Sequence, residues 1–123
     1  MDPKFQTRDL YRAIATLAYS LAITDGHLQD EERKAFIQII IDELGEQNGW
    51  AAASRFEILD EKRKPTVEQA YKEALYEISQ NKSAFTPAMR NSFVRILQNV
   101  SKAFKGSSSQ EESIITRFVR DTN

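Results

Sequence analysis

The stretch ITDGHLQDEE at residues 23–32 separates two apolar helical runs, and it decides how we expect the chain to fold. A weakened copy, AFKGSSSQEE, occupies residues 103–112, and a shift of 80 positions superposes the two. The shift brings Gly26 onto Gly106, while the aspartate that precedes the first glycine is replaced by Lys105. We therefore expect two helical hairpins that are related by pseudo-duplication but that differ in function.

Apolar residues recur at helical spacing along most of the chain. Before the first turn they follow steps of four, three and four, which place them on one face of a helix. These residues are Leu10, Ile14, Leu17 and Leu21. No alternating run is long enough to be a convincing strand. Residues 1–123 are expected to form one all-α domain, a bundle of six helices, or of seven if the segment around Phe5 breaks from its neighbour.

The run after the turn, residues 35–44, is apolar around more than half of a helix. This pattern predicts the central and most buried helix of the bundle. Gly45 and Gly49 bracket an expected helix stop and short loop, and a third helix is expected over residues 50–59. Later helix starts are marked by cap residues: Thr66 with Gln69, Thr86 with Pro87, and Ser109 with Glu112.

The composition excludes several classes of function. The chain has 17 basic and 18 acidic residues and a formal net charge of −1, whereas a dedicated nucleic-acid-binding protein normally carries a marked basic excess. It has no cysteine and a single histidine, His27, so thiolate sites and sites that need two imidazoles are excluded. No nucleophile, base and orienting group can be assembled from the remaining residues. The sequence therefore predicts a protein that binds no nucleic acid and is not an enzyme.

Two features predict a soluble, cytoplasmic protein without a transmembrane segment. The longest apolar stretch, Ala35 to Ile41, is interrupted by Gln38 and is far too short to span a bilayer. The first residues, MDPK, lack the basic region and the apolar core of a signal peptide.

Acidic residues at the first turn are candidates for a metal site. Asp25, Asp30 and Glu32 offer carboxylate oxygens, the ligands that Ca²⁺, Mg²⁺ and Mn²⁺ prefer. If Asp25 is placed at the fifth position of a calcium-binding loop, the first and third positions fall on Leu21 and Ile23, which cannot ligate. A looser divalent site at these acids stays open beside a structural interpretation. In that interpretation the macrodipole favours each acid in the first helical turn by ~0.3–1 kcal/mol.

The run ATLAYSLAITDGHLQDEE, residues 15–32, resembles the signature of the TerB-like family. Its members are bacterial tellurite-resistance and stress-response domains, and one branch forms the N-terminus of a membrane-anchored DnaJ-type co-chaperone. The family pattern is matched by Asp25, Gly26, Leu28 and Glu32, whereas Thr24 stands where alanine is usual and Gln29 where a capping serine or threonine is usual. In the degenerate second hairpin, Gly106, Ser109 and Glu112 match, and Lys105 replaces the aspartate.

The resemblance implies an all-helical fold with acidic surface positions that bind a metal ion or a partner, and it supplies no reaction. We therefore expect a non-enzymatic TerB-like module of a bacterial stress-response system. It would act by binding a protein partner, with a divalent cation at the acidic turn as a further element, and it could associate with a membrane-bound complex. The alternative is a divalent-metal sensor or buffer. Trp50 with Phe56 is a candidate partner patch, although a tryptophan near a helix start more often lies at the edge of a core.

Overall fold

The computed structural model describes residues 3–25, 29–103 and 109–122, with side chains at 6–24, 29–103 and 113–122. These residues form six α-helices and no strand. The helices are α1 (Pro3–Ala22), α2 (Asp30–Leu44), α3 (Glu46–Ile58), α4 (Val67–Gln80), α5 (Pro87–Ala103) and α6 (Ser109–Asp121). Single 3₁₀ turns follow α1 (Ile23–Asp25) and α4 (Lys82–Ala84), and a π-helical turn (Leu59–Arg63) extends α3. The all-α prediction is confirmed, and the segment around Phe5 stays in one helix with its neighbour.

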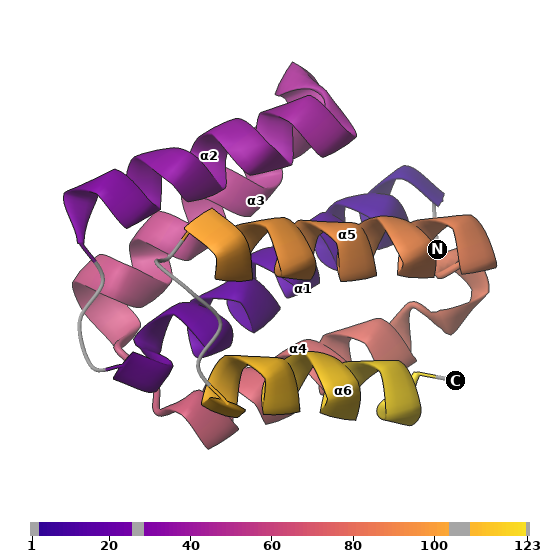
Figure 1. The fold of residues 1–123 in the computed structure, drawn as a ribbon. Coiled ribbons are helices and arrows are strands. Elements are labelled where there is room, and N and C mark those ends of the chain that lie inside the picture. The colour runs from indigo at the N-terminus through magenta and orange to yellow at the C-terminus, as the bar shows by residue number, and fades with distance from the viewer. Residues whose placement is uncertain (1–2, 26–28, 104–108, 123) are drawn as a thin grey trace.

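The central helix of the bundle is α1. It packs against α3, α4, α5 and α6, and Figure 1 shows it in the middle, with α2 and α3 above it and α4 and α6 below. Every residue from Ala13 to Ala22 is buried. The two polar side chains with hydrogen bonds inside this stretch are satisfied within the helix, because Thr16 donates to the Arg12 carbonyl at 3.1 Å and Ser20 to the Leu17 carbonyl at 2.6 Å.

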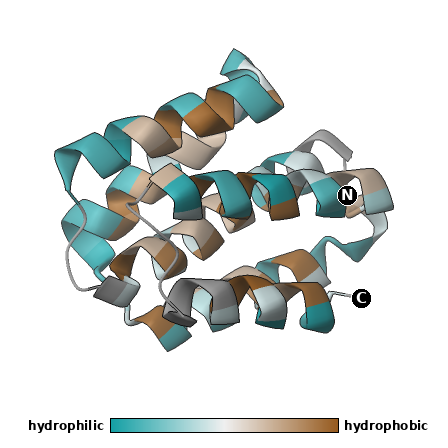
Figure 2. Ribbon diagram, in the orientation of Figure 1, coloured by the Kyte–Doolittle hydropathy of each residue, from teal (hydrophilic) through white to brown (hydrophobic). Residues whose placement is uncertain are grey.

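The prediction that residues 35–44 form the most buried helix is wrong. On α2 only Phe36 and Ile40 are buried, while Ile37, Ile39 and Ile41 are half-buried. The physical reason is that α2 carries polar residues at every turn of its outer face, whereas the alanines of α1 let neighbouring helices approach from all sides. Figure 2 shows hydrophobic residues in the middle of α2 and hydrophilic ones at both ends.

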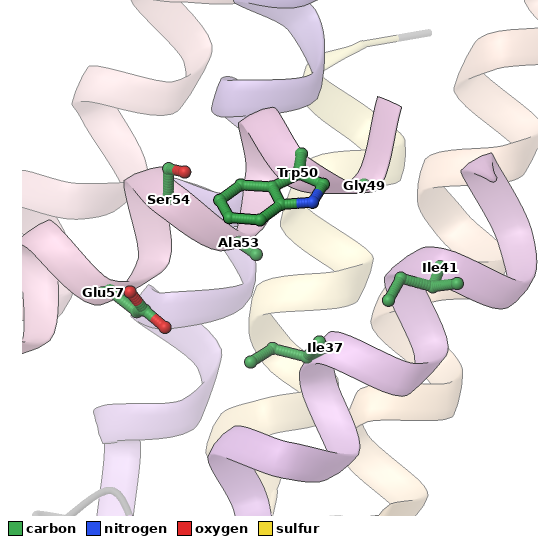
Figure 3. Close-up of a pocket in the computed structure, with 7 residues that line it drawn as sticks. All are labelled: Ile37, Ile41, Gly49, Trp50, Ala53, Ser54 and Glu57. Carbon is green, nitrogen blue, oxygen red and sulfur yellow. The ribbon is translucent and has the colours of Figure 1, made fainter. Parts of the chain in front are cut away.

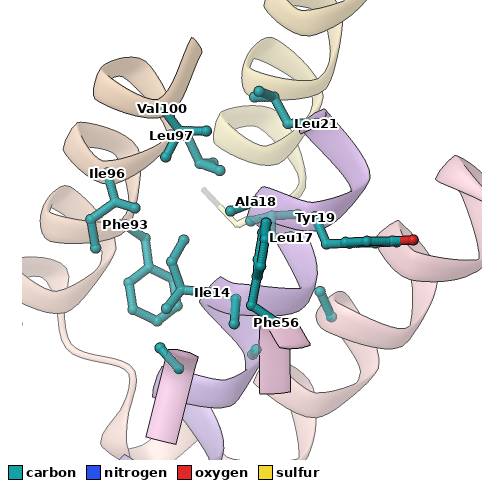
Figure 4. Close-up of a cluster of buried hydrophobic side chains, with 14 of the residues drawn as sticks. Ile14, Leu17, Ala18, Tyr19, Leu21, Phe56, Phe93, Ile96, Leu97 and Val100 are labelled. Atoms are coloured by element: carbon teal, nitrogen blue, oxygen red, sulfur yellow. The ribbon is translucent and has the colours of Figure 1, made fainter. Parts of the chain in front are cut away.

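The core follows the predicted apolar spacing. Leu10, Ile14, Leu17 and Leu21 are each 0 % exposed, and Figure 4 shows the last three among side chains from α3 and α5. An aromatic group joins α1, α2 and α3. In it Phe36 stacks on Phe56 with ring centroids 4.1 Å apart, and Tyr19 meets the edge of Phe56 at 5.8 Å.

Two of the predicted helix starts are confirmed. Gln69 donates its backbone N–H to Thr66 Oγ1 at 3.1 Å, and Thr66 donates its own to Gln69 Oε1 at 2.9 Å, which is a capping box. Thr86 Oγ1 accepts the backbone N–H of Met89 at 3.1 Å. The pair Ser109 and Glu112 lies outside the described side chains.

The junction of α2 and α3 differs from the prediction. Gly45 ends α2 with φ of +88°, a conformation that favours glycine, but no loop follows, since α3 begins at Glu46. Gly49 lies inside α3, where an added Cβ would stand 3.2 Å from side-chain atoms of both Ile40 and Ile41. Gly49 therefore permits a close approach of two helices instead of ending a loop.

Among the described residues, no helix combines the length and the apolar character needed to cross a membrane.

Candidate functional site

The structure describes the side chains of two of the three acids predicted as metal ligands. Asp25 is the last residue of the 3₁₀ turn after α1, but its side chain lies outside those described, as do Gly26, His27 and Leu28 entirely. Asp30 accepts a hydrogen bond from Arg33 Nη1 at 2.9 Å. Among the described residues, no three histidine, cysteine or carboxylate side chains gather in a way that could hold a metal ion. A site that includes Asp25 stays a prediction.

Glu32 has a structural role that the sequence did not reveal. Its Oε1 accepts the backbone N–H of Gln29, the residue before the first turn of α2, at 2.8 Å. This hydrogen bond satisfies an amide at the helix start that would otherwise lack a partner. The glutamate three residues after Gln29 therefore caps the start of α2.

A shallow apolar cleft lies between α2 and α3, on the side of these helices that faces away from α1. Its volume is about 280 Å³, and its lining residues are Ile37, Ile41, Gly49, Trp50, Ala53, Ser54 and Glu57. Figure 3 shows that the two isoleucines come from α2 and the others from α3. The indole of Trp50 stands at the mouth, because this residue is 72 % exposed.

The phase of α3 explains why Trp50 lies outside the core. Ala52, Phe56 and Leu59 form the buried stripe of this segment and are each 0 % exposed. Trp50 precedes Ala52 by two residues, which turns it about 200° around the helix axis. The predicted patch of Trp50 with Phe56 is therefore half wrong. Phe56 belongs to the core, and Trp50 instead lines the cleft together with Ile37 and Ile41.

Small residues on α3 shape the cleft. Gly49 lets the end of α2 approach closely, and Ala53 fills little of the space between Ile37 and Ile41 on the facing helix. At the other end, Arg33 of α2 forms an ion pair with Asp60 of the π-helical turn. The two helices are thus joined at both ends, and the apolar floor between them is left uncovered.

The segment that carries the cleft is strongly acidic. Residues 29–61 contain nine acidic and three basic residues, a formal charge of −6, whereas the whole chain has −1. Glu46, Glu57 and Glu61 are all exposed, and their spacing places them on the same side of α3 and its extension as Trp50. Among the described side chains, none of these three glutamates forms an ion pair.

The described acids outside residues 29–61 behave differently, since every one of them is in an ion pair. The pairs are Asp9 with Arg12, Glu68 and Asp121 with Arg117, Glu73 with Arg63, and Glu77 with Arg55. Among the described side chains, the uncompensated negative charge is therefore concentrated on α2, α3 and the π-helical turn.

The described carboxyl groups with shifted pKa values all have structural partners. A hydrogen bond from Arg95 holds the pKa of Glu43 below its usual value, and one from Arg63 does the same for the pKa of Glu73. Burial raises the pKa of Glu77, and its contact with Arg55 opposes that rise. None of these three glutamates lines the cleft, so they do not mark it as a site of acid–base chemistry.

Comparisons with protein-family models, with curated proteins and with solved structures find no significant match for this chain. The interpretation of the cleft therefore rests on its own geometry. Its volume of about 280 Å³ is at the lower limit of small-molecule pockets, which are usually about 300–1,000 Å³. An exposed tryptophan beside half-buried aliphatic side chains is more typical of a surface that receives another protein.

Proposed function

We propose that this chain is a non-enzymatic helical module that binds a protein partner through the cleft between α2 and α3. The observation that carries the proposal is the exposure of Trp50, 72 % of whose surface is open to solvent, directly over an apolar floor. Tryptophan is enriched among the residues that dominate binding energy at interfaces. Burial of its exposed part against a partner would contribute through the hydrophobic effect, at roughly 25 cal/mol per Å² of apolar surface.

We further propose that the module is of the TerB-like, stress-response type. Support comes from the helix boundaries, because a shift of 80 residues moves α1 and α2 to within a few residues of α5 and α6. The two halves pack differently, however. Helix α2 packs against α3 and α5, whereas α6 packs against α5 and α1. Under this proposal the first copy has acquired the binding cleft, and the second serves to close the bundle.

The binding proposal predicts that a captured partner depends on Trp50. We expect a protein recovered from extracts of the source cells, and then purified, to bind Trp50→Ala at least about tenfold more weakly than wild type, the loss usual for a dominant interface residue. Isothermal titration calorimetry measures the difference. Tyr76→Ala is the matched control, since Tyr76 is an aromatic residue of α4 that is 66 % exposed and does not line the cleft. Equal binding by Trp50→Ala and wild type would show that the cleft is not the binding surface.

The alternative function, a divalent-metal sensor or buffer, is supported by the acidic sequence of the first turn. It predicts that Ca²⁺, Mg²⁺ or Mn²⁺ raises the midpoint of thermal unfolding, because a ligand that binds only the native state stabilises it by about 2.7 kcal/mol at one hundred times its Kd. We expect Asp25→Asn to abolish this rise. Glu32→Gln is the informative second variant, since its amide oxygen can still accept the Gln29 hydrogen bond while it ligates a cation less well. Identical midpoints with metal and with chelator would exclude this function.

A further inference from the structure

Beyond partner binding itself, the charge around the cleft defines what kind of partner fits. We propose that the cleft between α2 and α3 receives a basic amphipathic helix, with apolar side chains on its floor and lysine or arginine side chains against Glu46, Glu57 and Glu61. This inference rests on the proposed function, because it names the partner for the same surface.

The shape of the surface favours a helix as the partner. The cleft is the groove between two helices that pack side by side, and α3 alone has 13 residues, a length of about 20 Å at 1.5 Å per residue. Side chains of a third helix fit such a groove as ridges, with anchors spaced three or four residues apart. The described residues contain no strand to which an extended peptide could add.

The floor of the cleft has room for such anchors. Ile37 and Ile41 are four residues apart on α2 and are only half-buried, so a partner side chain can cover both. Ala53 on the facing helix leaves space for it, and Trp50 offers the largest exposed apolar surface beside them. The arrangement fits one or two aliphatic or aromatic anchors of a partner helix.

The charges select a basic partner. Glu57 lines the cleft itself, and Glu46 and Glu61 lie further along the same side of α3 and its extension. Since none of the three has an ionic partner among the described side chains, a bound cation would meet a carboxylate that gives up no existing ion pair. Complementary charge of this kind steers association and excludes partners of the wrong sign.

The same charges disfavour a second copy of this chain as the occupant. In a symmetric dimer the two identical clefts would face each other, and each would bring a segment with a formal charge of −6. Like charges placed together at an interface oppose association. A partner with positive charge around its apolar anchors has no such obstacle.

Two synthetic peptides test the proposal. Both are amphipathic, about 16 residues long, without tryptophan, and carry leucines at helical anchor spacing; one has lysine and the other glutamate at the flanking positions. Because Trp50 is the only tryptophan of the chain, its fluorescence reports coverage of the cleft directly. We expect the lysine peptide to bind at least about tenfold more tightly at low salt, and the difference to shrink at high ionic strength because exposed charges are then screened.

Variants assign the effect to residues. The triple substitution of Glu46, Glu57 and Glu61 by glutamine is expected to remove most of the preference for the lysine peptide. Trp50→Ala is expected to bind the lysine peptide at least about tenfold more weakly than wild type, as measured by calorimetry. Glu31→Gln tests whether loss of one negative charge away from the cleft has any effect. Glu31 is exposed, forms no ion pair among the described side chains, and does not line the cleft, so we expect this variant to behave as wild type.

The outcomes separate this inference from the proposed function. Equal binding of both peptides, with loss of both in Trp50→Ala, would overturn the basic partner and leave the cleft as a protein-binding surface. No binding of either peptide up to about 1 mM, a concentration that corresponds to roughly 4 kcal/mol of binding free energy, would overturn the helical partner. Self-association that covers Trp50, seen by analytical ultracentrifugation and fluorescence, would show that the cleft receives a second copy of this chain instead of a basic helix.

Discussion

Replacement of Phe56 by alanine is expected to destabilise the protein by about 3–5 kcal/mol, the usual loss when a fully buried phenylalanine is truncated. Phe56 is 0 % exposed, and its ring joins three helices through contacts with Phe36 and Tyr19. Removal of the ring leaves a cavity that cannot collapse easily, because the neighbours on α1 are held on several sides by other helices. The expected loss is a large part of the stability of a domain of this size.

Chemical unfolding in urea, followed by circular dichroism, measures this loss. Ile58→Ala is the matched control on the same helix, since Ile58 is 46 % exposed and its truncation should change the stability by about 0.5 kcal/mol or less. If Phe56→Ala were no more destabilising than Ile58→Ala, the aromatic contact between α1, α2 and α3 would not be part of the core.

The helical class and much of the core were predictable, because they depend on local signals. The spacing of the apolar residues in α1 predicts its buried side, and the capping box at Thr66 and Gln69 fixes a helix start through hydrogen bonds between residues three positions apart. Both features are determined within one or two turns of helix. Tertiary packing has little opportunity to override them.

Which helix is the most buried was not predictable from hydrophobicity alone. Isoleucines make residues 35–44 of α2 apolar around more than half of the helix, yet α1 takes the centre because its small residues and self-satisfied hydroxyls tolerate contact on every face. The prediction that Gly49 ends a loop was wrong for a related reason. Its lack of a side chain serves a contact with Ile40 and Ile41, and such contacts between helices leave no local sequence signal.

The candidate site was predictable only in part. Helical phase alone places Trp50 opposite the buried stripe of α3, and the acidic excess of residues 29–61 can be counted in the sequence. The ion-pair partner of each acid, in contrast, cannot be predicted from the sequence. Glu57 and Glu77 are both glutamates on helices, and only the fold shows that the first has no ionic partner among the described side chains while the second is held by Arg55.

Arg55→Met is expected to destabilise the protein by about 2–4 kcal/mol at neutral pH, because loss of one partner of a largely buried ion pair leaves the other charge uncompensated. Arg55 donates to both carboxylate oxygens of Glu77, at 3.0 and 3.2 Å, and the side chains of both residues are only 19 % exposed. Arg55 also donates to Thr16 on the central helix at 3.3 Å. The pair therefore joins α3 and α4 to α1.

The effect should depend on pH in a defined direction. Burial already raises the pKa of Glu77 in the folded protein, and Arg55 opposes that rise, so the pKa of Glu77 should be higher still in Arg55→Met. A carboxyl group whose pKa is raised on folding takes up a proton more readily in the native state. Its destabilising effect is then absent below the unfolded pKa and develops as the pH rises through the folded one. We expect the deficit of the variant to be small near pH 4 and to grow toward pH 7.

Urea unfolding of wild type, Arg55→Met, Glu77→Gln and the double variant, at about pH 4 and pH 7, measures this dependence as a double-mutant cycle. The coupling between Arg55 and Glu77 should be large at pH 7 and should fall at pH 4, where a larger fraction of Glu77 is protonated and neutral because burial raises its pKa. The double variant should recover part of the stability that Arg55→Met loses, since it buries no unpaired charge. A deficit of the same size at both pH values would instead assign the role of Arg55 to its contact with Thr16 and to packing.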